Sequence, residues 1–122
     1  MNNHHQINYV ELPSSNLTKT QSFYKEVFGW SFQDYGPAYV AIVNAGLDGG
    51  FYLSENIAST QNGSVLVVLY SDDIETTLSK VEQAHGTISK PIFSFPGGRR
   101  FHFNDLTGNE LAVWSDHEIR QV

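Results

Sequence analysis

One pattern of elements occurs twice in this chain, and this internal repeat restricts the possible folds more than any other feature. Each copy begins with β-forming residues, continues with apolar residues at helical spacing up to a glycine, and ends in short strand-like runs. Leu17 in the first copy matches Ile74 in the second, and Gly29 matches Gly86 at the same offset. A repeat of about 50 residues indicates two copies of one supersecondary unit.

The first copy predicts a strand, a helix and three more strands. Residues 7–12 have strand character, and we expect Pro13 to end this strand because proline has no N–H to donate to a ladder. Residues 14–16 offer N-cap side chains for a helix that ends at Gly29. The strands after this helix are expected at residues 30–35, 39–43 and 51–53.

The second copy predicts the same order of elements. β-forming residues cover 65–69, and Asp72 with Glu75 three positions later is a capping-box signature for a helix that continues to Gly86. The remaining strands are expected at residues 87–95, 99–104 and 110–115.

These elements predict an α+β fold made of two βαβββ modules. A helix covers one face of each sheet, and two modules can bury the bare faces by curling into one mixed-sheet cup with a concave interior. Side chains that fill the interior would instead give two packed sheets without a cavity. The predicted single domain, residues 1–122, comprises module one (6–55), a linker (56–63), module two (64–116) and a tail (117–122).

The composition disfavours several classes of partner. Seven Lys plus Arg against thirteen Asp plus Glu give a net charge of −6, whereas nucleic-acid binding needs a basic face. The sequence has no cysteine, which excludes thiolate metal sites and agrees with a reducing compartment. The first residues are polar, and no apolar run has membrane-spanning length. We therefore expect a cytoplasmic protein that binds neither nucleic acid nor membrane.

The strands near the C-terminus separate an apolar face from a polar one, because side chains alternate between the two faces of a strand. The expected core face comprises Phe101, Phe103, Leu111 and Val113. The opposite face, which combines charge, imidazole and indole, comprises Arg100, His102, Glu110, Ala112 and Trp114. We predict that this second face contacts a ligand.

Three segments carry a resemblance to a known group. They read Ile-Asn-Tyr-Val-Glu-Leu-Pro at 7–13, Phe-Tyr-Lys-Glu-Val-Phe-Gly-Trp at 23–30, and Asp-Leu-Thr-Gly-Asn-Glu-Leu at 105–111. In this order they resemble the glyoxalase/bleomycin resistance/extradiol dioxygenase superfamily, or vicinal oxygen chelate fold, and especially small bacterial proteins related to lactoylglutathione lyase. The resemblance implies paired βαβββ modules, a homodimer and, in the enzymes, a divalent metal held by His and Glu.

The positions of those metal ligands carry poor donors in this chain. The resemblance places them at Tyr9, Phe51, Leu66 and Ala112. Divalent metals need oxygen or nitrogen ligands, and a phenol is at best an occasional one. We therefore predict no metal and no other cofactor. A two-residue shift in the first and last strands would instead bring Glu11 and Glu110 to these positions.

His102 and Glu11 are the candidate catalytic residues. An imidazole near Arg100, with Glu110 across the hairpin, can act as an acid or base, although a hydrogen-bonded strand histidine is the commoner role. Glu11 shares the inward face of Tyr9, where it either moves protons or pairs with an arginine.

The glycine-rich turn before the strand at 99–104 is a candidate anion-binding site. Gly97, Gly98, Arg99 and Arg100 could cradle an anion, but a plain β-turn with two solvated arginines is the expected structure.

Two functions are consistent with these residues. The first is a small-molecule binding protein, acting in resistance or sequestration, with a metal-free aromatic pocket. Its expected lining comprises Tyr9, Glu11, Phe51, Leu66, Arg100, His102, Glu110, Ala112 and Trp114. The second is a lyase, isomerase or dioxygenase that uses Glu11 or His102 as a base, or a displaced metal site formed by Glu11, His102 and Glu110.

Overall fold

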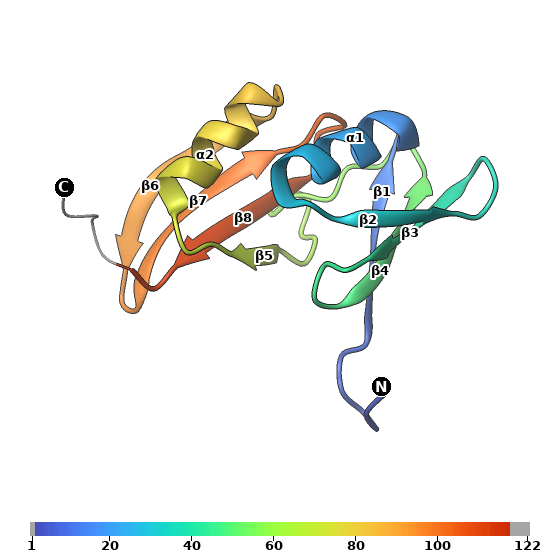
Figure 1. Cartoon of the computed structure of the whole chain (residues 1–122), viewed down its shortest axis with the longest axis horizontal. Helices are drawn as coiled ribbons and strands as arrows, with labels where there is room; N and C mark the ends of the chain where they lie inside the picture. The colour runs from blue at the N-terminus through green and yellow to red at the C-terminus, as the bar shows by residue number, and fades with distance from the viewer. Residues whose placement is uncertain (1, 118–122) are drawn as a thin grey trace. The chain divides into compact units, whose positions relative to one another are not determined.

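The chain divides into two compact units, residues 1–57 and 58–122, each with one helix and one four-stranded sheet (Figure 1). The structure is a computed structural model that describes residues 2–117. Residues 118–122 of the predicted tail lie outside the described residues. The division between the units falls inside the predicted linker.

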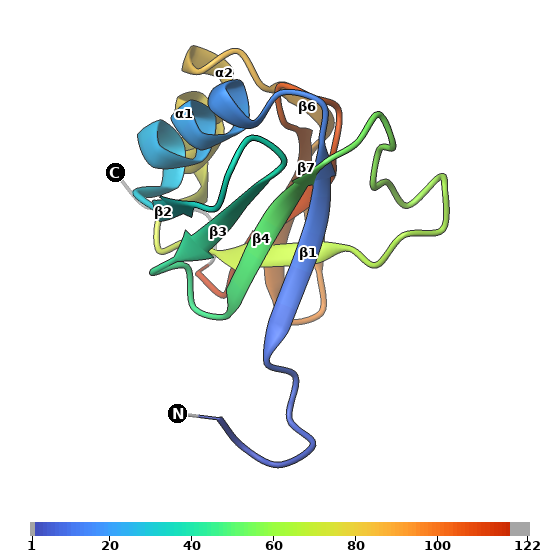
Figure 2. The ribbon, with the colours of Figure 1, turned by 90° about the vertical axis from the view of Figure 1, so that its right-hand side faces the viewer.

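Module one contains a strand, a helix and three strands. Its elements are β1 (Tyr9–Ser14), α1 (Leu17–Phe28), β2 (Ser31–Asp34), β3 (Tyr39–Val43) and β4 (Asp48–Leu53). The strand order is β1-β4-β3-β2, in which β1 runs parallel to β4 and the other neighbours are antiparallel (Figure 2).

Module two repeats this topology. Its elements are β5 (Val67–Tyr70), α2 (Ile74–Gln83), β6 (Thr87–Phe95), β7 (Gly98–Asn104) and β8 (Glu110–Ser115). The strand order is β5-β8-β7-β6, again with one parallel pair, β5 with β8. The predicted α+β class with two βαβββ modules is therefore confirmed.

The corner between the first strand and the helix has the same construction in both modules. Ser14 Oγ lies 2.8 Å from Thr20 Oγ1, and Ser71 Oγ lies 2.7 Å from Thr77 Oγ1. Each serine also accepts a hydrogen bond from the backbone N–H two residues later. The repeat therefore extends to individual hydrogen bonds.

This corner explains a difference from the predicted start of α2. Asn16 caps α1, as expected, and accepts a hydrogen bond from the backbone of the third residue after it. The cap of α2 is Asp73 rather than Asp72, because Asp73 follows Ser71 at the spacing at which Asn16 follows Ser14.

Two other boundaries differ from the sequence prediction. Pro13 lies inside β1, opposite Tyr52, and is tolerated because β1 is an edge strand of its sheet. Gly29 ends α1 in the left-handed region with a φ of 71°, as expected, but after α2 the left-handed residue is His85 with a φ of 73°, not Gly86.

The core of each module lies between its helix and its sheet. On module one, α1 buries Phe23, Tyr24 and Val27, and the Tyr24 ring lies 5.4 Å from that of Phe51 on β4. On module two, the helix-facing residues are fully buried, as predicted; they are Phe101, Phe103, Leu111 and Val113. None of the helices among residues 2–117 is long and apolar enough to cross a membrane.

Candidate functional site

The polar face of module two brings together the histidine and glutamate that the sequence placed there. His102 on β7 pairs in register with Ala112 on β8, and Asn104 pairs with Glu110. His102 Nδ1 lies 2.7 Å from Glu110 Oε2, which confirms the expected proximity across the hairpin. The His102 side chain is only 2% exposed and the Glu110 side chain 9%.

The turn between β7 and β8 fixes this register. Asp105 Oδ1 accepts hydrogen bonds from the backbone N–H groups of Thr107 and Asn109, each at 3.0 Å. Gly108 takes a φ of 100°, which glycine adopts without steric cost. The segment predicted as a turn therefore holds Glu110 at the start of β8.

A residue of the predicted linker completes the environment of Glu110. Thr60 donates its backbone N–H and its hydroxyl to Glu110 Oε1, each at 2.8 Å. Asn109 Oδ1 accepts the backbone N–H of Ala58 at 2.9 Å, which anchors the segment that carries Thr60. We call Thr60, His102 and Glu110 the histidine cluster. Sequence reasoning missed Thr60, because nothing in a polar segment indicates a partner 50 residues away.

Glu110 is held as a carboxylate. Burial opposes its ionisation, but the hydrogen bonds from His102 and Thr60 outweigh burial and lower the pKa of Glu110 to about 2. An ionised carboxylate can only accept hydrogen bonds, so the proton of a neutral His102 ring must lie on Nδ1. His102 Nε2 is buried and has no hydrogen-bond partner among the described residues.

Arg100 lies on the same face two residues before His102. Its guanidinium carbon is 5.4 Å from the centre of the Phe93 ring and 5.9 Å from that of Phe95. The Phe93 ring also lies 6.0 Å from the imidazole of His102, so it adjoins both Arg100 and His102. Trp114 is the cross-strand partner of Arg100 and lies 6.3 Å from Phe95. The face therefore combines polar groups with an aromatic wall.

The two adjacent arginines are half-buried, whereas the sequence predicted two solvated side chains. Arg99 points to the helix side, where it pairs with Glu75 of α2 at 2.7 Å and is 11% exposed. Glu75 therefore pairs with a strand instead of forming the predicted capping box. Alternation along β7 places Arg100 on the other face.

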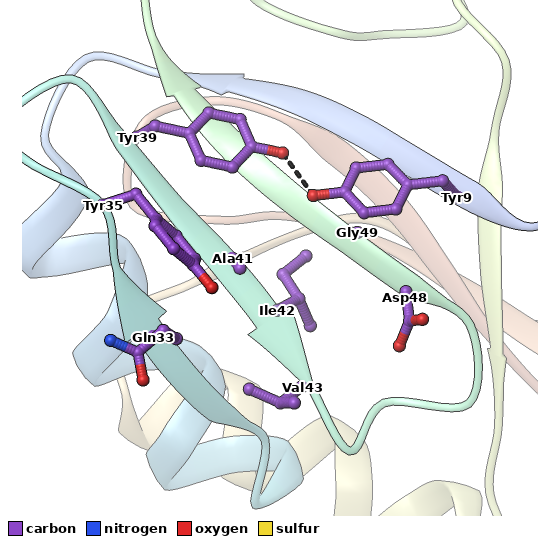
Figure 3. A pocket seen from close by; sticks show the side chains of 9 residues that line it. All are labelled: Tyr9, Gln33, Tyr35, Tyr39, Ala41, Ile42, Val43, Asp48 and Gly49. Carbon is purple, nitrogen blue, oxygen red and sulfur yellow. Dashed lines mark hydrogen bonds between the residues drawn. The ribbon is translucent and has the colours of Figure 1, made fainter.

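The sheet of module one carries an open groove of about 410 Å³ on the face away from α1. Figure 3 shows its side chains, with the hydroxyls of Tyr9 and Tyr39 turned toward each other. This tyrosine groove is lined by Tyr9, Gln33, Tyr35, Tyr39, Ala41, Ile42, Val43, Asp48 and Gly49. Sequence reasoning singled out only Tyr9 of these residues, because no short motif marks the others.

A chain of hydrogen bonds joins the groove to Glu11. Tyr39 donates its hydroxyl to Glu11 Oε2 at 2.9 Å, so Tyr9, 2.6 Å away, must donate to Tyr39. Burial and these hydrogen bonds raise the pKa of Tyr39. The Tyr39 ring crosses β4 at Gly50, where a Cβ would meet the hydroxyl at 1.9 Å. The partner of Glu11 is thus a phenol, not the arginine considered from the sequence.

The four positions assigned by resemblance to metal ligands lie in different surroundings. Tyr9 faces the groove, and Ala112 is buried beside His102. Leu66 lies one residue before β5 and is half-buried. Phe51 is a correction: it is fully buried on the helix side of its sheet against Tyr24, so a ligand on the opposite face cannot reach it. By alternation, the neighbouring residue that faces away from α1 is Tyr52.

The donor set does not fit a resident metal. Phenylalanine, leucine and alanine offer no ligand atoms, and the open Nε2 of His102 is a single donor, whereas a metal site needs three or more protein ligands. Within residues 2–117, no three or more His, Asp or Glu side chains are grouped closely enough to hold a metal ion. Within module two, His102 and Glu110 are the two members of the displaced site considered from the sequence, and two side chains are fewer than the three or more ligands that a metal site needs.

Comparisons with known proteins agree with this architecture. A family model described as Glyoxalase/Bleomycin resistance protein/Dioxygenase superfamily matches residues 6–113. A protein of Mycolicibacterium smegmatis described as uncharacterized is 29% identical over 114 residues, which cover 91% of this chain and 94% of that protein.

Two solved structures show the same fold. A variant of FosX, a fosfomycin resistance protein of Listeria monocytogenes, was solved with Mn(II) and a dihydroxypropylphosphonic acid. It has a TM-score of 0.75 at 14% identity, covering 90% of this chain and 89% of that chain. A lactoylglutathione lyase of Agrobacterium tumefaciens has a TM-score of 0.67 at 17% identity, covering 91% and 93%.

Proposed function

Because the chain belongs to the glyoxalase/bleomycin resistance protein/dioxygenase superfamily, we propose that it binds a small organic molecule at the polar face of module two. The observation that supports this most directly is His102, whose ring is buried and fixed by Glu110 while its Nε2 lacks a partner among the described residues. Leaving such an atom unbonded costs about 1–3 kcal/mol. A ligand that bonds to Nε2 would remove this cost.

The proposed contacts come from the set that the sequence suggested. Arg100, His102 and Trp114 form the main surface, Glu110 orients His102, and Ala112 lies beside the imidazole. Tyr9 and Glu11 on module one and Leu66 on module two stay predictions from the sequence. Phe51 is excluded because it packs in the helix-side core.

We propose that this binding needs no resident metal and serves resistance or sequestration. FosX shows that a protein of the same fold can hold Mn(II), so metal content must be measured directly. We also propose that the protein is cytoplasmic and forms a homodimer. Light scattering tests the dimer, and a mass equal to that of the 13.7 kDa chain would contradict it.

The test combines metal analysis, ligand-induced melting shifts and turnover. Dialysed protein should carry no stoichiometric Ni, Zn, Mn or Fe. A library of small organic molecules should raise the melting temperature of the wild type, since a ligand at 100 times its Kd adds about 2.7 kcal/mol. The His102→Gln variant should lose this shift. Stoichiometric metal that survives dialysis, or no shift with any compound, would contradict the proposal.

An enzyme is the second candidate, favoured by the hydrogen bond between Glu110 and His102. With the proton held on Nδ1, Nε2 of a neutral ring has a lone pair that can accept a proton from a bound substrate. Turnover of methylglyoxal with glutathione by metal-free protein would support this alternative. His102→Gln should then reduce kcat by about 100-fold or more while the variant stays folded. Equal turnover in both proteins would reject His102 as the base.

A further inference from the structure

Arg100 is a cation without an anionic partner on the proposed binding face. Its Nε is buried and has no hydrogen-bond partner among residues 2–117, and no carboxylate in that part of the chain forms an ion pair with it. The chain has thirteen acidic residues and a net charge of −6, so counter-ions are plentiful in the sequence. Within residues 2–117, the guanidinium nevertheless contacts the rings of Phe93 and Phe95 and no carboxylate.

The adjacent residue Arg99, unlike Arg100, has an anionic partner. Arg99 occupies the opposite face of the same strand and pairs with Glu75 at 2.7 Å. A guanidinium stacked on an aromatic ring gains about 0.5–2 kcal/mol, whereas desolvating a charge without a counter-ion costs several kcal/mol. Arg100 is half-buried, and the rings of Phe93 and Phe95 contact its guanidinium without neutralising its charge.

The surroundings of Arg100 add to the positive character of this face. Lys90 on β6 is the cross-strand partner of His102, which adds a basic residue to the strand next to β7. Glu110 is occupied by His102 and Thr60, and Asp116 accepts the hydroxyl of Tyr70. Neither carboxylate forms an ion pair with Arg100.

We propose that the molecule bound at this face is an organic anion with a flat apolar part. The anionic group binds the guanidinium of Arg100, a neighbouring polar atom of the ligand bonds to Nε2 of His102, and the apolar part lies against Phe93 and Trp114. This inference rests on the proposed binding function and adds the charge of the ligand. The shared chemistry is that of a carboxylate, phosphonate or phosphate group, which guanidinium binds through paired N–H donors.

The experiment uses the full chain with probes that differ in charge but not in shape. Benzoate and phenylphosphonate are the anionic probes, and benzamide is the neutral counterpart of benzoate. Binding is followed by NMR through the Nε–H resonance of Arg100 and the indole N–H of Trp114, at concentrations up to about 10 mM. We expect saturable shifts with at least one anion, at least tenfold weaker binding of benzamide, and weaker anion binding as salt rises.

Two variants of adjacent residues provide a matched pair. Arg100→Gln should weaken binding of the anionic probe at least tenfold and remove its preference over benzamide. Arg99→Gln, which changes the same charge on the helix side, should bind the probe like the wild type. Unfolding measurements on both variants separate an effect on binding from a loss of stability.

The outcomes distinguish this inference from the proposed function. Equal affinity for benzoate and benzamide, or unchanged anion binding by folded Arg100→Gln, would overturn the anionic ligand while leaving the binding function intact. The absence of a saturable shift with either anion would also overturn it. If no compound of the wider library shifts the melting temperature either, the binding function fails as well.

Discussion

Replacing Glu110 by glutamine tests the histidine cluster with almost no change in shape. The carboxylate accepts three hydrogen bonds, one from His102 and two from Thr60. A glutamine amide can keep its oxygen toward Thr60, but its NH2 group then faces Nδ1 of His102. Two donors cannot bond to each other, so the imidazole must move its proton to Nε2 or lose the contact.

The expected loss of stability follows from the ionisation of Glu110. A fall in pKa from the usual 4.5 to about 2 corresponds to roughly 3 kcal/mol in favour of the carboxylate in the folded state. Glu110→Gln should therefore lower the free energy of unfolding by about 2–3 kcal/mol at pH 7. Glu110→Ala leaves the His102 and Thr60 donors unpaired and should cost about 3–5 kcal/mol.

The pH dependence gives a sharper test than the loss at one pH. Because the folded pKa lies below the unfolded one, the carboxylate contributes its full stabilisation above about pH 4.5 and loses it as the pH falls to about 2. The difference in unfolding free energy between the wild type and Glu110→Gln should therefore shrink across this window.

Urea unfolding at a series of pH values measures this difference, and NMR of the imidazole nitrogens reports which one carries the proton. Glu75→Gln is the matched control: its partner Arg99 is largely buried, but Glu75 itself is 48% exposed, so we expect a loss below about 1 kcal/mol. Parallel stability curves for the wild type and Glu110→Gln from pH 2 to 5, or an unchanged tautomer in the variant, would refute the reasoning.

Two further predictions concern the fold. Gly98→Ala should cost about 1–3 kcal/mol in urea unfolding, because its Cβ would lie 2.0 Å from the backbone oxygen of Ser115; an unchanged midpoint would contradict this contact. Asn16→Ala and Asp73→Ala should each cost about 1 kcal/mol in thermal unfolding, since both residues cap a helix at equivalent corners; clearly unequal losses would show that the two corners differ in energy.

The repeat was predictable from the sequence, and so was the face of the C-terminal strands on which each side chain lies. Helix spacing, glycine stops and β-forming runs are local signals, and they located α1 and the hairpin of β7 and β8 closely. Period-two alternation correctly placed Phe101 and Val113 in the core and His102 beside Glu110. The errors at Pro13 and Asp72 arose where a strand edge or a serine corner, rather than the residue itself, set the boundary.

The site was only partly predictable, because sequence patterns indicate which side chains share a face but not which residues they contact. Thr60 was part of an unremarkable linker, and Arg99 and Arg100 were equivalent until the sheet separated them. Glu11 was expected to act as a base or to pair with an arginine, and the fold gave it Tyr39. The pairings of Thr60 with Glu110, Arg99 with Glu75 and Glu11 with Tyr39 join residues that are at least 24 positions apart.

The sequence by itself determined the two βαβββ modules and which side chains share a face, because both depend on spacing along a few consecutive residues. The tertiary structure alone decided the partners of other polar groups: Thr60 bonds to Glu110, Arg99 pairs with Glu75, and Arg100 contacts aromatic rings but no carboxylate within residues 2–117. A hydrogen bond or ion pair needs its two groups within a few ångströms of each other, and the sequence alone does not say which strand, helix or linker segments come that close.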